Sequence, residues 1–168
     1  MGLFTPDFDN LRELYTTSLQ RQLNSERQIT VALEEMKAKA TANQLAAAFS
    51  KHLDETKEHV SRLERILKES VGKVSDSKCK ITSALISGAQ DDISSAGDAQ
   101  IRDVVLIASG NQVEHHEIAM YGTLRNWAMI LGETKHAELL EKTLEEEKEA
   151  DKMLTKLSEQ INVAAPVS

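Results

Sequence analysis

The segment QVEHHEIAMYGT, residues 112–123, places two carboxylates and two imidazoles at four consecutive positions. Glu114 and Glu117 are three residues apart, so on an α-helix they lie on one face. The residues around them are apolar enough for that helix to be buried. If these two glutamates point toward the core of a fold, the core must contain cations or hydrogen-bond donors that bind their carboxylates. The predicted fold has to provide such partners.

The composition favours one globular domain spanning residues 1–168. Of these residues, 40% are hydrophobic and 28% charged, and the net charge is −7. This acidic balance argues against a nucleic-acid partner. No apolar run approaches the roughly 20 residues of a membrane-spanning helix, and no secretory signal is visible. Cys79 is the only cysteine and cannot form an intrachain disulfide, so a reducing, cytoplasmic setting is expected.

The spacing of apolar residues predicts an all-α protein. The only prolines are Pro6 and Pro166, so the strongest helix breaker is absent between them. Apolar residues recur at helical spacing, and runs of β-branched residues with period 2 are absent. Asp98 is predicted to be the N-cap of a helix. The predicted long helices cover residues 9–39, 43–71, 98–131 and 135–161, and a short helix covers residues 81–94.

The lengths of the connections predict how these helices are arranged. The first and third links are short, which makes the joined helices antiparallel neighbours. The second link is much longer and carries the short helix. The sequence therefore predicts a ferritin-like four-helix bundle with one long crossover connection that carries a short extra helix.

Each long helix carries at least one carboxylate among its apolar positions. Glu26 lies between Leu23 and Ile29, and Glu147 follows Leu144 at the spacing of one helical turn. In the second helix, two histidines flank a glutamate beside the apolar stripe. The candidate metal ligands are Glu26, Glu55, Glu114, Glu117, Glu147, Asp151, His52 and His59.

The cost of burial links these residues to metal ions. A lone carboxylate in a dry bundle is penalised by about several kcal/mol, and a group of them would repel one another. Hard cations remove both problems, and carboxylate oxygens suit iron or manganese. Two ions bridged by shared carboxylates need about this many ligands. We therefore expect two iron ions, with manganese as the alternative.

The ligand pattern departs from the one that recurs in ferritin-like di-metal proteins. That pattern takes a Glu from each of two helices and Glu-x-x-His from each of the other two. Here Glu55 is followed three residues later by Glu58, and Glu147 by Ala150, while Glu114 and Glu117 form Glu-x-x-Glu. The sequence leaves open whether any histidine binds metal.

Four segments carry a resemblance to a known family: IRDVVLIA (101–108), VEHHEIAMYGTL (113–124), HLDETKEHVSRLE (52–64) and TLEEEKEADKML (143–154). Over residues 11–157 the chain resembles the bacterial YciE/YciF-like ferritin-like stress proteins, relatives of the rubrerythrin group. The resemblance implies a ferritin-like fold, a di-iron site and a homodimer. It also implies a ligand role for Glu26, Glu55, Glu114, Glu117 and Glu147, and Asp151 matches a recurring Asp of the family.

Other charged residues have ordinary interpretations. Most glutamates on helices are solvated surface charges, so Glu145, Glu146 and Glu149 are expected to face solvent. His115 and His116 are adjacent and cannot both point inward. One of them is expected at the surface or beside a ligand carboxylate, to which it would donate an N–H.

Three functions remain open at this point. The first is a di-metal oxidoreductase in which ferrous ions are oxidised by peroxide or dioxygen. The second is a non-catalytic metal-binding protein, and the third is a structural or interaction bundle with vestigial carboxylates. The short helix carries several apolar residues that could be buried against a second copy of the chain, among them Ile81, Leu85, Ile86 and Ile93. We therefore expect a homodimer.

Overall fold

Five α-helices and a final 3₁₀ turn make up the part of the chain that this computed structural model describes, residues 8–167. No strand occurs within those residues, which confirms the all-α prediction. The elements are α1 (Leu11–Lys39), α2 (Asn43–Val71), α3 (Lys80–Ser95), α4 (Ala99–Ile130), α5 (Thr134–Ile161) and η1 (Asn162–Ala164). Residues 1–7 and 168 lie outside the described part.

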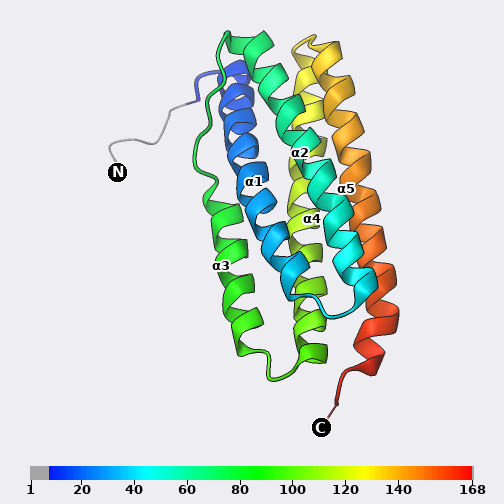
Figure 1. Ribbon diagram of the computed structural model, residues 1–168. Helices are drawn as coiled ribbons and strands as arrows, with labels where there is room; N and C mark the ends of the chain where they lie inside the picture. The colour runs from blue at the N-terminus through cyan, green and yellow to red at the C-terminus, as the bar shows by residue number, and fades with distance from the viewer. Residues whose placement is uncertain (1–7, 168) are drawn as a thin grey trace.

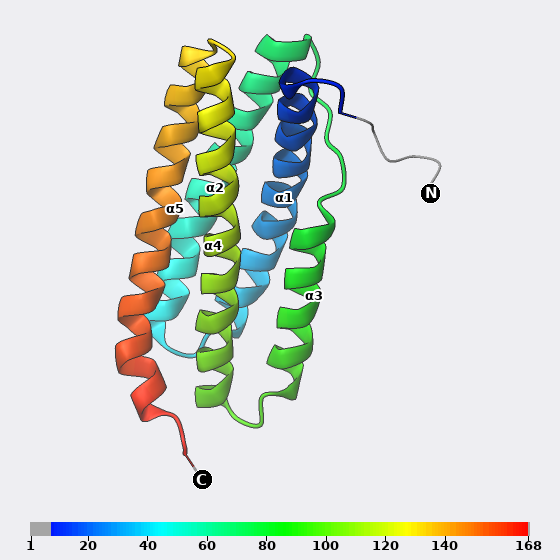
Figure 2. The ribbon, with the colours of Figure 1, turned by 180° about the vertical axis from the view of Figure 1, so that it is seen from behind.

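The four long helices form a bundle in which α2 and α4 run in the same direction, and α3 packs on its outside (Figures 1 and 2). Helices α1 and α2 form one antiparallel hairpin, and α4 and α5 form the other. After α2 the chain returns along α1, enters α3 and reaches the start of α4 at the opposite end of the bundle (Figure 1). This is the predicted crossover, and the short helix that it carries covers the side of the bundle formed by α1 and α4.

Helix ends follow local signals in the sequence. The side chain of Asn10 accepts a hydrogen bond from the backbone N–H of Glu13 at the start of α1. Asp98 accepts one from Ile101 N at 2.8 Å and caps α4, as predicted. Helix α2 ends at Gly72, which has φ 75°, a left-handed conformation that glycine adopts without steric cost.

Buried and half-buried hydrogen bonds hold the crossover against α1. The hydroxyls of Ser25 and Thr82 lie 2.6 Å apart, and Asn24 Oδ1 accepts a hydrogen bond from Cys79 N at 2.9 Å. These bonds satisfy polar groups that burial would otherwise penalise. They fix the start of α3 beside the middle of α1.

The core is divided into two apolar clusters, one toward each end of the bundle. One cluster is built around Tyr15, Leu63 and Leu124, and the other around Phe49, Leu106 and Leu154. Ile93 belongs to the second cluster, so this residue of the expected dimer surface is core, whereas Ile81 is 59% exposed. A band of buried polar side chains lies between the clusters. No helix of the described part is both long enough and apolar enough to span a membrane.

Candidate metal centre

Six ionisable side chains fill the band between the two apolar clusters. All four long helices contribute: α1 and α5 give one glutamate each, α4 gives two glutamates, and α2 gives two histidines. None is more than 5% exposed. The residues are Glu26, His52, His59, Glu114, Glu117 and Glu147.

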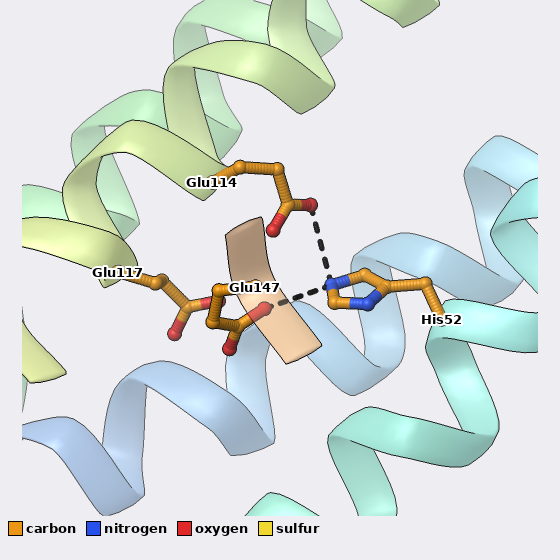
Figure 3. A group of neighbouring side chains, drawn as sticks. All are labelled: His52, Glu114, Glu117 and Glu147. Atoms are coloured by element: carbon orange, nitrogen blue, oxygen red, sulfur yellow. Dashed lines mark ion pairs between the residues drawn. The ribbon is translucent and has the colours of Figure 1, made fainter. Parts of the chain in front are cut away.

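The first group of these side chains surrounds His52 (Figure 3). The ring nitrogen Nε2 of His52 lies 3.2 Å from Glu114 Oε1 and 3.5 Å from Glu147 Oε2. Glu117 points toward the same space from α4, one helical turn after Glu114 (Figure 3). One potential ligand atom from each of the four residues lies within 4.8 Å of the others, which is close enough for a shared ion.

The second group surrounds His59. Its Nδ1 lies 3.1 Å from Glu147 Oε1 and 3.6 Å from Glu26 Oε2. Glu147 belongs to both groups and offers a different oxygen to each histidine. A carboxylate in this position is suited to bridge two ions.

Many polar atoms of the two groups have no hydrogen-bond partner, although several lie at ion-pair distance. Buried polar atoms are almost always hydrogen bonded, because an unpaired one costs about 1–3 kcal/mol. Within the described residues, more than half of the buried side-chain N and O atoms that lack a partner belong to the six residues. They are Glu26 Oε2, both ring nitrogens of His52, His59 Nδ1, Glu114 Oε2, Glu117 Oε2 and both oxygens of Glu147.

Burial makes the ionised carboxylates unfavourable without a counter-ion. The pKa of Glu117 lies well above its ordinary value, first because burial removes water from the carboxylate and then because Glu26 and Glu147 repel its charge. Burial likewise raises the pKa of Glu147 to about 8, although the neighbouring His59 opposes this shift. The metal-free site therefore keeps protons that a bound cation would displace.

The carboxylate neighbours of the two histidines raise the pKa of both imidazoles against the effect of burial. Burial alone would lower the pKa of His59, but Glu26, Glu146 and Glu147 outweigh it and raise the value to about 12. For His52, burial is again outweighed, mainly by Glu114, and the pKa lies well above normal. Both imidazoles thus act as internal cations in the metal-free protein.

Two further side chains hold the glutamates in place. The hydroxyl of Tyr121 donates a short hydrogen bond to Glu26 Oε1, and Gln22 Nε2 donates one to Glu117 Oε1 at 2.8 Å. Gln22 was absent from the sequence prediction. The available signal was its position four residues before Glu26, on the same helix face.

A network on the outer side of His59 was also missed. Its Nε2 lies 3.0 Å from Glu146 Oε2, and Arg62 contacts both oxygens of Glu146. Glu146 was expected to face solvent, and this is wrong: its side chain is only 25% exposed. Burial would raise its pKa, but His59 and Arg62 lower it to about 2. The carboxylate therefore stays ionised and fixes the orientation of the imidazole.

Glu55 lies outside both groups. Its carboxylate contacts Lys51 Nζ at 2.7 Å and lies 3.6 Å from His52 Nδ1, and its side chain is 24% exposed. Helical geometry explains this position: at about 100° per residue, His59 is rotated about 20° from His52, whereas Glu55 is rotated about 60°. The histidines therefore point into the bundle and Glu55 lies at its edge, so its role as a ligand stays a prediction.

Asp151 and His115 pair with each other away from the buried groups. His115 Nε2 lies 3.2 Å from Asp151 Oδ1, and Asn111 Nδ2 donates to the same oxygen at 2.7 Å. The side chain of His115 is 72% exposed. His116 turns toward Cys79, so neither of the adjacent histidines reaches the ligand carboxylates.

The donor set fits a pair of transition-metal ions. Four carboxylates and two imidazoles are also the ligands of the ferritin-like di-metal pattern, but they are distributed differently here. In that pattern two helices each supply Glu-x-x-His. In this protein α4 supplies both glutamates of Glu-x-x-Glu, and α2 supplies both histidines, seven residues apart.

Comparison with known proteins gives the family. Residues 10–165 match the family described as Domain of unknown function (DUF892). The chain belongs to this family. A DUF892 relative, Protein YciF of Escherichia coli strain K12, is 40% identical over 150 residues, which cover 88% of this chain and 90% of YciF. The resemblance inferred from the sequence is thereby confirmed.

Solved structures of similar proteins agree with the fold. The crystal structure of the E. coli stress protein YciF matches with a TM-score of 0.89 and 34% identity, covering 94% of this chain and 100% of that one. YcfI of Rhodopseudomonas palustris matches with a TM-score of 0.87 and 33% identity over 91% and 98% of the two chains. The helical bundle of this chain is therefore shared with the stress protein YciF and with YcfI.

Proposed function

We propose that this stress-protein relative binds two divalent transition-metal ions in the polar band of its bundle and oxidises ferrous ion there. The observation that carries the proposal is the convergence of buried carboxylate and imidazole atoms that have no hydrogen-bond partner. One ion would be held by His52, Glu114, Glu117 and Glu147. The other ion would be held by Glu26, His59 and Glu147. Glu147 is shared by the two groups and would bridge the two ions.

The types of ligand favour iron. Carboxylate oxygens suit hard cations, whereas imidazole nitrogen suits iron and other transition metals better than magnesium or calcium. Four carboxylates and two imidazoles can also hold manganese, which is the alternative metal. Cys79 is buried and unpaired, which fits a reducing cytoplasm in which iron stays ferrous.

In this proposal ferrous ion is the substrate and peroxide or dioxygen the oxidant. Each of two ferrous ions gives up one electron. One hydrogen peroxide takes both electrons together with two protons and leaves as two water molecules; one dioxygen takes the same electrons and protons and leaves as hydrogen peroxide. The protein's contribution is to hold both ions in one dry site, where neighbouring charges act strongly.

A structural role without catalysis is the second candidate. The description of YcfI, whose fold this chain shares, proposes a structural role for that protein. Metal binding without oxidation would fit the same buried site. The two candidates differ in what happens after the metal has bound.

Anaerobic titration with ferrous ion followed by addition of peroxide separates the candidates. We expect two ions per chain and oxidation that is fast relative to free ferrous ion in the same buffer. Glu147→Ala should lose much of both signals, because it removes a residue shared by the two groups. Glu145→Ala, whose side chain is 58% exposed on the same helix, is the matched control.

Each alternative has its own outcome. Absence of metal from the anaerobically loaded protein would overturn the proposal and favour a structural bundle. Two bound ions that oxidise no faster than free ferrous ion would support a metal-binding protein without ferroxidase activity.

A further inference from the structure

A cavity of about 30 Å³ lies between α1, α3 and α4. Its walls are formed mainly by apolar side chains. They include Ile29, Leu33 and Met36 of α1, Ile86, Ala89 and Ile93 of α3, and Val113 of α4. A cavity needs only about 10–15 Å³ to hold one water-sized molecule, so this one has room for a small guest.

The lining of the cavity includes residues of the surface and one residue of the candidate metal centre. Its rim carries exposed Glu35 and Gln90, whose side chains form a hydrogen bond of 3.4 Å between α1 and α3. Its wall also includes Glu114, which is only 2% exposed and belongs to the first ligand group. The crossover helix α3 therefore covers a cavity that borders a ligand of the candidate metal centre.

The mainly apolar lining of this cavity favours an apolar guest molecule. A polar molecule such as hydrogen peroxide would lose hydrogen bonds to water there and find few replacements. Apolar cavities of this kind stay dry and accept apolar guests such as xenon. Among the oxidants of a ferrous site, dioxygen is the small, neutral and apolar one.

A different cavity reaches Glu114 from the opposite side of the bundle. It measures about 40 Å³ and lies between α2 and α5, and its lining combines charged side chains such as Lys51 and Glu149 with apolar ones such as Phe49 and Met153. Its charged rim suits a hydrated cation. Both cavities reach the same ligand, and charged residues make up a larger share of the lining in the second.

We propose that the cavity between α1, α3 and α4 binds dioxygen and delivers it to the metal ions beside Glu114. This inference rests on the proposed function and specifies its oxidant. Two electrons from two ferrous ions and two protons would convert the dioxygen to hydrogen peroxide, which is polar and disfavoured by the apolar walls.

Filling the cavity tests the proposal. Ala89→Leu adds apolar volume to the wall from α3, and Ala32→Leu adds it from α1. Alanine and leucine have similar helix propensities, so the helices should persist. Ala84→Leu is the matched control, because Ala84 is exposed on α3 and lines an outer groove instead of this cavity.

Two readouts are needed. Crystals of the wild-type protein under xenon pressure should show xenon beside Ala89, and crystals of Ala89→Leu should not. In stopped-flow mixing of ferrous-loaded protein with dioxygen, Ala89→Leu and Ala32→Leu should slow oxidation about tenfold, equivalent to about 1.4 kcal/mol of added barrier. Ferrous affinity and oxidation by peroxide should match those of Ala84→Leu.

The outcomes separate this inference from the proposed function. Wild-type protein that binds ferrous ion but no xenon would overturn the dioxygen route alone. Equal dioxygen rates in the filled and control variants would do the same. Wild-type protein that binds xenon but no metal would overturn the proposed function, and with it the delivery role of the cavity. If one filled variant does not fold, the variant on the facing helix gives the answer.

Discussion

His59 Nδ1 lies 3.1 Å from Glu147 Oε1, inside the bundle. The other nitrogen of the same ring contacts Glu146, the preceding residue of α5, and Arg62 holds Glu146 from outside. One imidazole thus joins the buried ligand group to an ion pair near the surface. This arrangement resembles the carboxylate–histidine pairs that orient metal ligands.

Arg62→Gln is expected to lower the affinity for ferrous ion about 10–100-fold, because the carboxylate that orients His59 loses its anchor. Anaerobic titration measures this. Arg65→Gln is the control, since the side chain of Arg65 is 60% exposed and pairs with Glu69 on its own helix. Identical affinities in the two variants would show that the outer network does not position the ligand.

Glu117→Ala should abolish most of the stabilisation by metal. Metal at about 100 times its Kd should stabilise the wild type by about 2.7 kcal/mol, which is a rise in Tm of about 5–10 °C for a chain of this length. The variant should gain much less, while its metal-free form loses a source of repulsion. Thermal unfolding with and without ferrous or manganous ion gives the answer. Equal metal-induced shifts would mean that Glu117 is not a ligand.

Glu55→Ala should weaken metal binding less than Glu117→Ala does. Glu55 is paired with Lys51 at the edge of the site, and its 3.6 Å separation from His52 Nδ1 is its one contact with the buried groups that the structure records. Titration of both variants under the same anaerobic conditions compares them. A loss as large as that of Glu117→Ala would place Glu55 among the ligands, in agreement with the family resemblance.

The metal-free protein should become less stable as the pH rises from about 5 to about 8. The pKa of Glu147 is raised to about 8 in the folded state, so the fold holds a proton that the unfolded chain releases near its ordinary value. Its stabilising contribution is complete at acid pH and is lost as the pH rises through the folded value. Urea unfolding with a chelator present measures this slope. Glu147→Gln should flatten it, and an unchanged slope in the variant would contradict the assignment.

At lower pH, Glu146 has the opposite effect on the pH dependence of stability. Its pKa is lowered to about 2, so its contribution is present above the ordinary carboxyl value and disappears as the pH falls toward 2. The free energy of unfolding should therefore pass through a maximum on the acid side of neutrality.

The protein is expected to be a homodimer that uses the exposed side of α3. Ile81 is 59% exposed there and, with the half-buried Leu85, lines an open groove against α4. Light scattering at micromolar concentration should give twice the chain mass, and Ile81→Lys should reduce it. A clean monomer in the wild type would exclude this expectation.

The sequence determined the helices, and it determined Glu26 and Glu147 as the single ligand candidates with a core position on α1 and α5. Periodicity, the Asp98 cap and the glycine at residue 72 are local signals, and they act through backbone geometry that needs no distant partner. The phase of Glu26 and Glu147 within their apolar stripes was enough to predict burial, because a helix that packs along one stripe must bury everything on it.

Only the tertiary structure decided which residues of α2 face the site. His52, Glu55 and His59 fall within one side of the helix, and the rotation of α2 about its own axis depends on how it packs against α1 and α5. That rotation buried both histidines and left Glu55 partly exposed at the edge of the site. It also brought Arg62 to Glu146, a contact between residues 84 positions apart that no local pattern encodes. Such contacts depend on packing. The sequence of a helix indicates which of its faces is apolar, but it does not indicate which side chains of the neighbouring helices will contact that face.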